Sequence, residues 1–121
     1  MKTKWLMAAS AVVTALLGIA LTFAPAEVLH SFGGVANAAL SLVLQVAGAA
    51  FLGFAILNWM AKENTIGGIY NRPLALGNFL HFVAGAIAII KFAIAGHRDP
   101  IVIAVGAIYT LLAIGFGRIV F

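Results

Sequence analysis

An asparagine and a histidine stand three residues apart within a strongly apolar stretch of this chain. Asn78 and His81 therefore share one face of a helix, and they lie about 8 and 12 Å along it from Pro73 at 1.5 Å per residue. An imidazole can accept a proton, a ligand hydrogen bond or a metal ion, and an amide both donates and accepts. The pair predicts a polar site inside a helical assembly.

Further polar side chains in apolar surroundings are candidates for the same site. Asn58 is expected at a similar depth in a neighbouring helix, and Gln45 lies on a different face from Asn58, so the two are not expected to reach the same neighbour. We predict a ligand-binding pocket, open toward the cytoplasm, built from Asn58, Asn78, His81, Gln45, Tyr109 and Arg72. The alternative is that these groups form only interhelical hydrogen bonds that fix helix register.

Several kinds of site are not expected in this chain. The absence of cysteine removes disulfides, thiol catalysis and thiolate metal sites. His81 has no second histidine at its depth, so no metal site is predicted, and a haem would need its second axial ligand from another chain. The three carboxylates all lie at expected helix ends or in loops, which argues against a proton-coupled carrier with a buried acid. No catalytic residue is predicted.

Four apolar runs must position these side chains. They cover residues 5–24, 38–61, 73–95 and 100–121, and each is close to the roughly 20 residues that cross a hydrocarbon core. Charged residues make up 8% of the chain, against about 25% in soluble domains. The basic residues are scattered at helix ends, so no nucleic-acid partner is expected. We therefore predict one all-α transmembrane domain over residues 1–121.

The distribution of basic residues predicts the orientation of the spans. If the N-terminus is inside, the cytoplasmic side holds Lys2, Lys4, Lys62, Arg72 and Arg118. The other side then holds Lys91 and Arg98, which satisfies the excess of positive charge expected inside. The short link 96–99 forces the last two spans to be antiparallel neighbours. The prediction is an integral membrane four-helix bundle with antiparallel up-down topology and both termini in the cytoplasm.

Helix-breaking residues mark the ends of these spans. Pro25 is expected to end the first span, while Pro73 and Pro100 each begin one, with Asp99 as an N-cap. The segment 27–32 is expected to form a short amphipathic turn in the interface, and the glycine pair 67–68 marks a loop. Aromatic residues expected at the cytoplasmic boundary are Trp5, Trp59 and Tyr70.

Each span carries one stripe of small and polar residues beside a broad apolar face. Because lipid is as apolar as leucine, helices in membranes associate through such stripes, so we expect them to face other helices. The stripes are 10, 11, 14 and 18; 41, 45, 48, 49 and 52; 74, 78, 81 and 85; and 106, 109, 110, 113 and 117.

Two segments resemble the DoxX-like group of small bacterial four-helix membrane proteins. They are Phe-Ala-Pro-Ala-Glu-Val-Leu at 23–29, followed by Gly33, and Gly-Ala-Ala-Phe-Leu-Gly-Phe at 48–54. That family commonly carries charged residues around its first span, for which this chain has only Lys2 and Lys4. The resemblance implies a multi-pass protein of the bacterial inner (plasma) membrane and a subunit or partner of a redox system. It transfers no catalytic residue.

Two functions from different classes are expected. The first is a non-enzymatic accessory or interaction subunit that holds a lipid or quinone-like molecule between its helices. Its partners would be the bilayer and either further copies of the chain or a larger membrane complex. The alternative is a small membrane enzyme or carrier that uses the pocket around His81 and Asn78. No cofactor is predicted beyond such a quinone or lipid.

Overall fold

The computed structural model describes residues 2–63 and 72–121, all-helical apart from short links and helix ends. Its four long helices are α1 (Lys2–Phe23), α3 (Ala38–Ala61), α4 (Arg72–Ile94) and α5 (Pro100–Val120). All four are long and apolar enough to cross a membrane, as a multi-pass membrane protein requires. The expected bounds are confirmed for α3, and the other three helices begin or end within three residues of the prediction.

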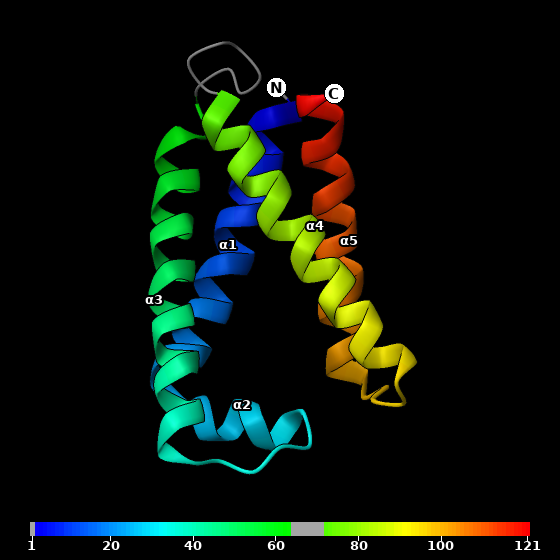
Figure 1. Cartoon of the computed structure of the whole chain (residues 1–121). Coiled ribbons are helices and arrows are strands. Elements are labelled where there is room, and N and C mark those ends of the chain that lie inside the picture. The colour runs from blue at the N-terminus through cyan, green and yellow to red at the C-terminus, as the bar shows by residue number, and fades with distance from the viewer. Residues whose placement is uncertain (1, 64–71) are drawn as a thin grey trace. The chain divides into compact units, whose positions relative to one another are not determined.

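The chain divides into two compact units, Met1–Glu63 and Asn64–Phe121. In the first unit α1 and α3 lie side by side, as Figure 1 shows. Their contacts run in opposite order along the two helices: Lys4 pairs with Glu63, and at the other end Gln45 reaches Thr22. The two long helices of this unit, α1 and α3, therefore form a hairpin.

The helices of the first unit approach most closely at two glycines. A Cβ atom added to Gly48 would stand 2.5 Å from Thr22 Oγ1 and 2.9 Å from the carbonyl oxygen of Gly18. One added to Gly18 would stand 3.0 Å from the carbonyl oxygen of Gly48. Such close backbone contact is how helices gain packing energy in lipid. The predicted stripes are confirmed here at Gly18 and Gly48.

A short helix, α2 (Pro25–Ser31), connects α1 to α3. It lies crosswise at the ends of both helices (Figure 1). Pro25 occupies its first turn, where a missing N–H group costs nothing. Gly33, with φ at 81°, ends it in a Schellman motif, in which Gly33 N–H donates to the His30 carbonyl and Gly34 N–H to that of Leu29. The expected turn over 27–32 is thus a helix that begins two residues earlier.

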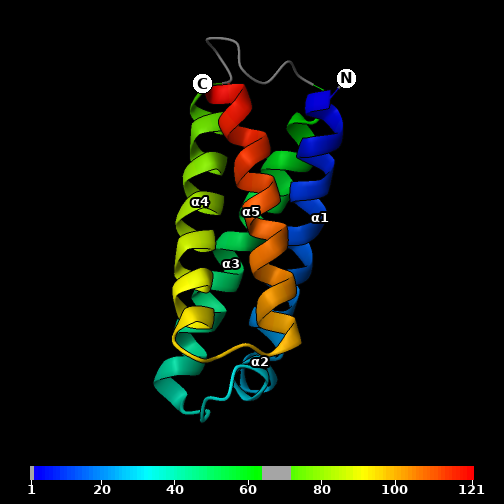
Figure 2. The same ribbon diagram turned by 90° about the vertical axis from the view of Figure 1, so that its right-hand side faces the viewer.

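In the second unit α4 and α5 lie side by side in both views (Figures 1 and 2). Aromatic rings hold the contact: the Phe82 ring lies 4.9 Å from that of Tyr109 and 5.8 Å from that of Phe116. A Cβ atom on Gly85 would stand 2.6 Å from Cε2 of Tyr109. The glycine therefore provides the space that the ring occupies, and the predicted stripes are confirmed at Gly85 and Tyr109.

The link between α4 and α5 is a second Schellman motif, centred on Gly96 with φ at 114°. Gly96 N–H donates to the Ala93 carbonyl, and His97 N–H to that of Phe92. The imidazole of His97 stacks on the Phe92 ring at 4.2 Å. Asp99 stands at the N-cap of α5, but its side chain makes no capping hydrogen bond. The prediction of Asp99 as the N-cap residue is therefore confirmed, although its exposed carboxylate makes no bond to the helix end.

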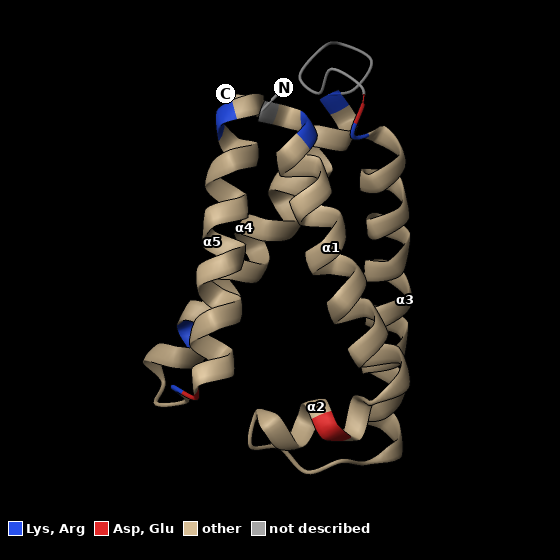
Figure 3. Ribbon diagram, turned by 180° about the vertical axis from the view of Figure 1, so that it is seen from behind, with Lys and Arg blue, Asp and Glu red and all other residues tan. Residues whose placement is uncertain are grey.

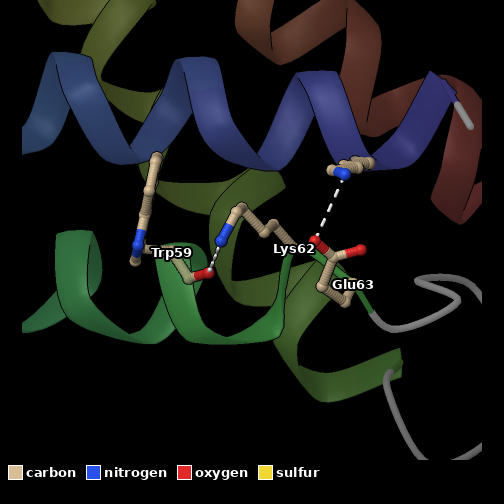
Figure 4. A network of polar contacts seen from close by, with 4 residues as sticks. Trp59, Lys62 and Glu63 are labelled. Carbon is tan, nitrogen blue, oxygen red and sulfur yellow. Dashed lines mark hydrogen bonds and ion pairs between the residues drawn. The ribbon is translucent and has the colours of Figure 1, made fainter.

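Charged residues of the described chain lie at or near helix ends (Figure 3). Where α3 ends, the Lys62 ammonium lies 4.0 Å above the Trp59 ring and donates to the Trp59 carbonyl. Beside it, Lys4 Nζ lies 3.2 Å from Glu63 Oε2 (Figure 4). The expected loop at 67–68 and the expected boundary position of Tyr70 lie outside the described residues.

Candidate functional site

The histidine singled out by the sequence meets a tyrosine from the next helix. His81 Nε2, on α4, lies 3.0 Å from Tyr109 Oη, on α5, and which atom donates depends on the imidazole tautomer. The two ring centroids are 5.4 Å apart. Gly85, one turn beyond His81, leaves room for the Tyr109 ring to come this close. Two of the predicted site residues are therefore brought together by one glycine.

Asn78 lies one turn before His81 on the same helix and is fully buried. Its amide donates to the Leu74 carbonyl of its own helix at 3.0 Å, a local bond that Asn commonly makes to preceding backbone. Arg72 is the first residue of α4 and is exposed. It lies about 9 Å along the helix from Asn78, six residues at 1.5 Å each.

Asn58 belongs to the first unit, where it links α3 to α1. Its amide donates to Ser10 Oγ at 3.0 Å, and Ser10 Oγ in turn donates to the Met7 carbonyl at 2.8 Å. Thr14 Oγ1 donates to the Ser10 carbonyl at 2.8 Å. All three polar side chains are fully buried. The sequence placed Ser10 and Thr14 on a packing face but did not identify Ser10 as the partner of Asn58.

Gln45 also reaches α1, through its amide to the Thr22 carbonyl at 3.3 Å. The prediction that Asn58 and Gln45 cannot meet the same helix is therefore wrong. The two residues do lie on different faces of α3, but the exposed Gln45 side chain is long enough to reach α1 from the flank. Their contacts on α1 are 12 residues apart, about 18 Å along the helix.

The predicted site residues thus divide between the two units. Asn58 and Gln45 lie in the first, and Arg72, Asn78, His81 and Tyr109 in the second. Within the second unit, His81 and Tyr109 are joined by a hydrogen bond. A pocket that combines Asn58 with Asn78 and His81 stays a prediction. In the described part of the chain, no three potential metal ligands lie together.

Two adjoining grooves run along α4 and α5, and neither is lined by Asn78, His81 or Tyr109. The larger has a volume of about 540 Å³ and the smaller about 300 Å³, within the size range of ligand sites. They share Ile90 and Thr110 in their linings. The polar side chains that line the larger groove are those of Thr110 and Arg98. The Thr110 hydroxyl already donates to the Gly106 carbonyl of its own helix, and Arg98 carries the charge.

The grooves have no counterpart in the sequence-based site prediction. Their linings consist mainly of Ile, Ala and Val, which any lipid-facing helix also carries. The available signal was the run of small residues on α5, of which Gly106 lines the larger groove and Ala113 the smaller.

The chain matches no family model, no curated protein and no solved structure. The resemblance to the DoxX-like group therefore stays a prediction. The features of the chain that bear on function are its helix pairs, their polar contacts and the grooves.

Proposed function

We propose that this chain is a non-enzymatic accessory subunit of the inner membrane that holds an apolar chain, from a lipid or a quinone-like molecule, between α4 and α5. One observation carries the proposal: the grooves of about 540 and 300 Å³ adjoin and are almost entirely apolar. An elongated apolar molecule fits such a surface, whereas a polar substrate would find few groups to bind.

The polar side chains support a structural use of their hydrogen bonds. Asn58 bonds to Ser10 in the first hairpin, and His81 bonds to Tyr109 in the second, so in each hairpin a side-chain hydrogen bond joins the two helices. Contacts of this kind stabilise helix association in membranes by about 0.6 kcal/mol each. They need no ligand to satisfy them.

The wider architecture that we propose is an up-down bundle of the four long helices, with both termini in the cytoplasm. Five of the seven basic residues would then face the cytoplasm, which follows the positive-inside rule. The resemblance to the DoxX-like group supports a bacterial inner-membrane location and a redox partner. Further copies of the chain are the alternative partner.

A second candidate is a small membrane enzyme or carrier that uses His81 and Asn78. The hydrogen bond between the His81 imidazole and the Tyr109 phenol favours it, because ionisable side chains within spans often mark functional sites. His81→Ala separates the two functions. Loss of activity with unchanged thermal stability supports an enzyme or carrier, and loss of stability alone assigns His81 to packing.

The main proposal is tested by native mass spectrometry of the full chain released from a mild detergent. We expect a bound lipid or quinone on the unmodified protein. Ala107→Phe, which fills the larger groove, should abolish that adduct. Ala104→Phe, on the same helix but outside both grooves, should keep it. A bare protein in all three cases contradicts the proposal.

A further inference from the structure

We propose that the larger groove binds an anionic phospholipid, with one acyl chain along α4 and α5 and the phosphate on Arg98. This inference rests on the proposed function and names its ligand class. Three observations support it: the position of Arg98, the length of the groove, and the distribution of polar groups along its lining.

Arg98 is held at the mouth of the groove by the backbone. The Schellman motif turns the chain back over the last turn of α4, and Arg98 Nε donates to the Ala93 carbonyl at 3.2 Å. Nothing in the described part of the chain accepts a hydrogen bond from its two terminal nitrogens. A guanidinium fixed through Nε keeps two parallel N–H donors for a phosphate, which arginine binds in this bidentate way.

The groove has the length of one bilayer leaflet. On α5 its lining extends from Val102 to Leu111, below Arg98 in the link. From Val102 to Leu111 the helix rises about 14 Å at 1.5 Å per residue. Half of a hydrocarbon core about 30 Å thick is about 15 Å. A groove of that length with a cation at one end matches a phospholipid, in which the charged phosphate stands at one end of an acyl chain about one leaflet long.

The headgroup must provide the selectivity. An acyl chain gains little from the groove, because the surrounding lipid is equally apolar. Thr110, the other polar residue of the lining, already donates to its own helix. A single cation near the membrane surface favours an anionic over a zwitterionic lipid by about fivefold. We expect that preference from Arg98.

Three other polar groups lie near Arg98 in sequence, and none lines the groove. The His97 ring is stacked on Phe92, and Lys91 is exposed in the last turn of α4. The Asp99 carboxylate is exposed and makes no capping bond. Its negative charge opposes a phosphate, so Asp99→Asn should increase the preference for anionic lipid.

The test uses the full chain in detergent, titrated with phosphatidylglycerol or phosphatidylcholine that carry the same acyl chains. Native mass spectrometry measures the bound fraction of each lipid. We expect about fivefold stronger retention of phosphatidylglycerol by the unmodified protein. Arg98→Gln should bring the two lipids to equal retention, and Arg98→Lys should keep part of the difference. Lys91→Gln, a charge change at the same end of α4 but outside the groove, is the matched control and should lower the preference less than Arg98→Gln does.

The outcomes separate the two proposals. Retention of both lipids equally by the unmodified protein, with loss in Ala107→Phe, overturns this inference and leaves the proposed function standing. No retained lipid overturns both. A second copy of the chain that leaves when Ala107 is replaced, without any lipid, also overturns this inference. If Arg98→Gln lowers thermal stability but keeps the preference, Arg98 only caps α4 and the phosphate site is wrong.

Discussion

The two helix hairpins solve the same packing problem in different ways. In the α1–α3 hairpin the two backbones contact each other where Gly18 and Gly48 meet. In the α4–α5 hairpin the contact is made by a side chain, because the Tyr109 ring fills the space beside Gly85. The two grooves described here lie along α4 and α5. A small residue at an interface therefore has two uses: it brings helices together or admits a side chain.

The largest loss of stability should come from a substitution of Gly48, the glycine that contacts the backbone of α1. In Gly48→Leu the new Cβ atom would stand 2.9 Å from the Gly18 carbonyl oxygen and 2.9 Å from the Thr22 backbone nitrogen, and these backbone atoms cannot move without separating the helices. Overpacking of this kind costs about 1–3 kcal/mol or more, so we expect loss of folded protein. The measurement is thermal unfolding in detergent. Gly53→Leu, on the same helix with nothing within 4 Å, is the control and should unfold like the unmodified chain.

A smaller loss of stability, which a second substitution should remove, is expected at Gly85, the glycine that contacts the Tyr109 ring. Gly85→Ala should lower the free energy of unfolding by about 1–3 kcal/mol, because the Tyr109 ring must shift. Combining it with Tyr109→Ala removes the obstacle, so the double variant should be no less stable than Tyr109→Ala alone. Gly77→Ala, which meets nothing within 4 Å, is the control on α4.

The same rescue should fail in the first hairpin. Combining Gly48→Ala with Thr22→Ala leaves the Gly18 carbonyl 2.9 Å from the new Cβ atom. Unfolding of both double variants in parallel tests the contrast between the hairpins. Equal rescue in the two would show that the distinction between backbone and ring contact is wrong.

The two polar pairs should contribute less than the glycines. Tyr109→Phe removes the hydroxyl that meets His81 and keeps the ring, and Ser10→Ala removes the acceptor of Asn58. Hydrogen bonds between membrane helices average about 0.6 kcal/mol and reach about 1.7, so we expect losses in that range. Double-mutant cycles with His81→Ala and Asn58→Ala measure each coupling. A coupling near zero would exclude a contribution of that pair to stability.

The smallest effect is expected from the ion pair at the end of the first hairpin. Lys4 and Glu63 are 3.2 Å apart, with side chains 41% and 64% exposed. Exposed pairs contribute about 0–1 kcal/mol, and salt screens them. Glu63→Gln should therefore lower stability slightly at low salt and not at high salt. Glu27→Gln, a carboxylate on α2, should show no such dependence on salt.

The helices of this chain were predictable because membrane crossing imposes a length on apolar sequence. The bounds of α3 were predicted without error, and Pro100 marked where α5 begins. The glycines on packing faces were predictable for the same reason, since lipid leaves close approach as a main source of helix association. The start of α2 was predicted two residues too late, because Pro25 was taken only as the end of the first span although it also fits the first turn of a helix.

Partners of polar groups were less predictable than their faces. The sequence placed Ser10 and Tyr109 on contact faces, but a pairing such as Asn58 with Ser10 depends on how two helices are aligned lengthwise. The partner of Gln45 was equally hard to predict. Its long side chain reaches the Thr22 carbonyl on α1 from a different face of α3 than that of Asn58. The sequence predicted only the charge that Arg98 adds to one side of the membrane. Its position beside the larger groove could not be predicted, because it depends on the turn at Gly96. Short-range patterns determine faces, and long-range alignment determines partners.

The crosswise position of α2 has a consequence for bilayers of different thickness. With α2 lying across the ends of α1 and α3 and Glu27 exposed on it, this end of the hairpin resists entering hydrocarbon. The charged residues at the other end resist it equally. Neither end can slide inward when the membrane thickens or thins. We expect such a hairpin to adapt by tilting as a body, a common response of membrane helices to hydrophobic mismatch.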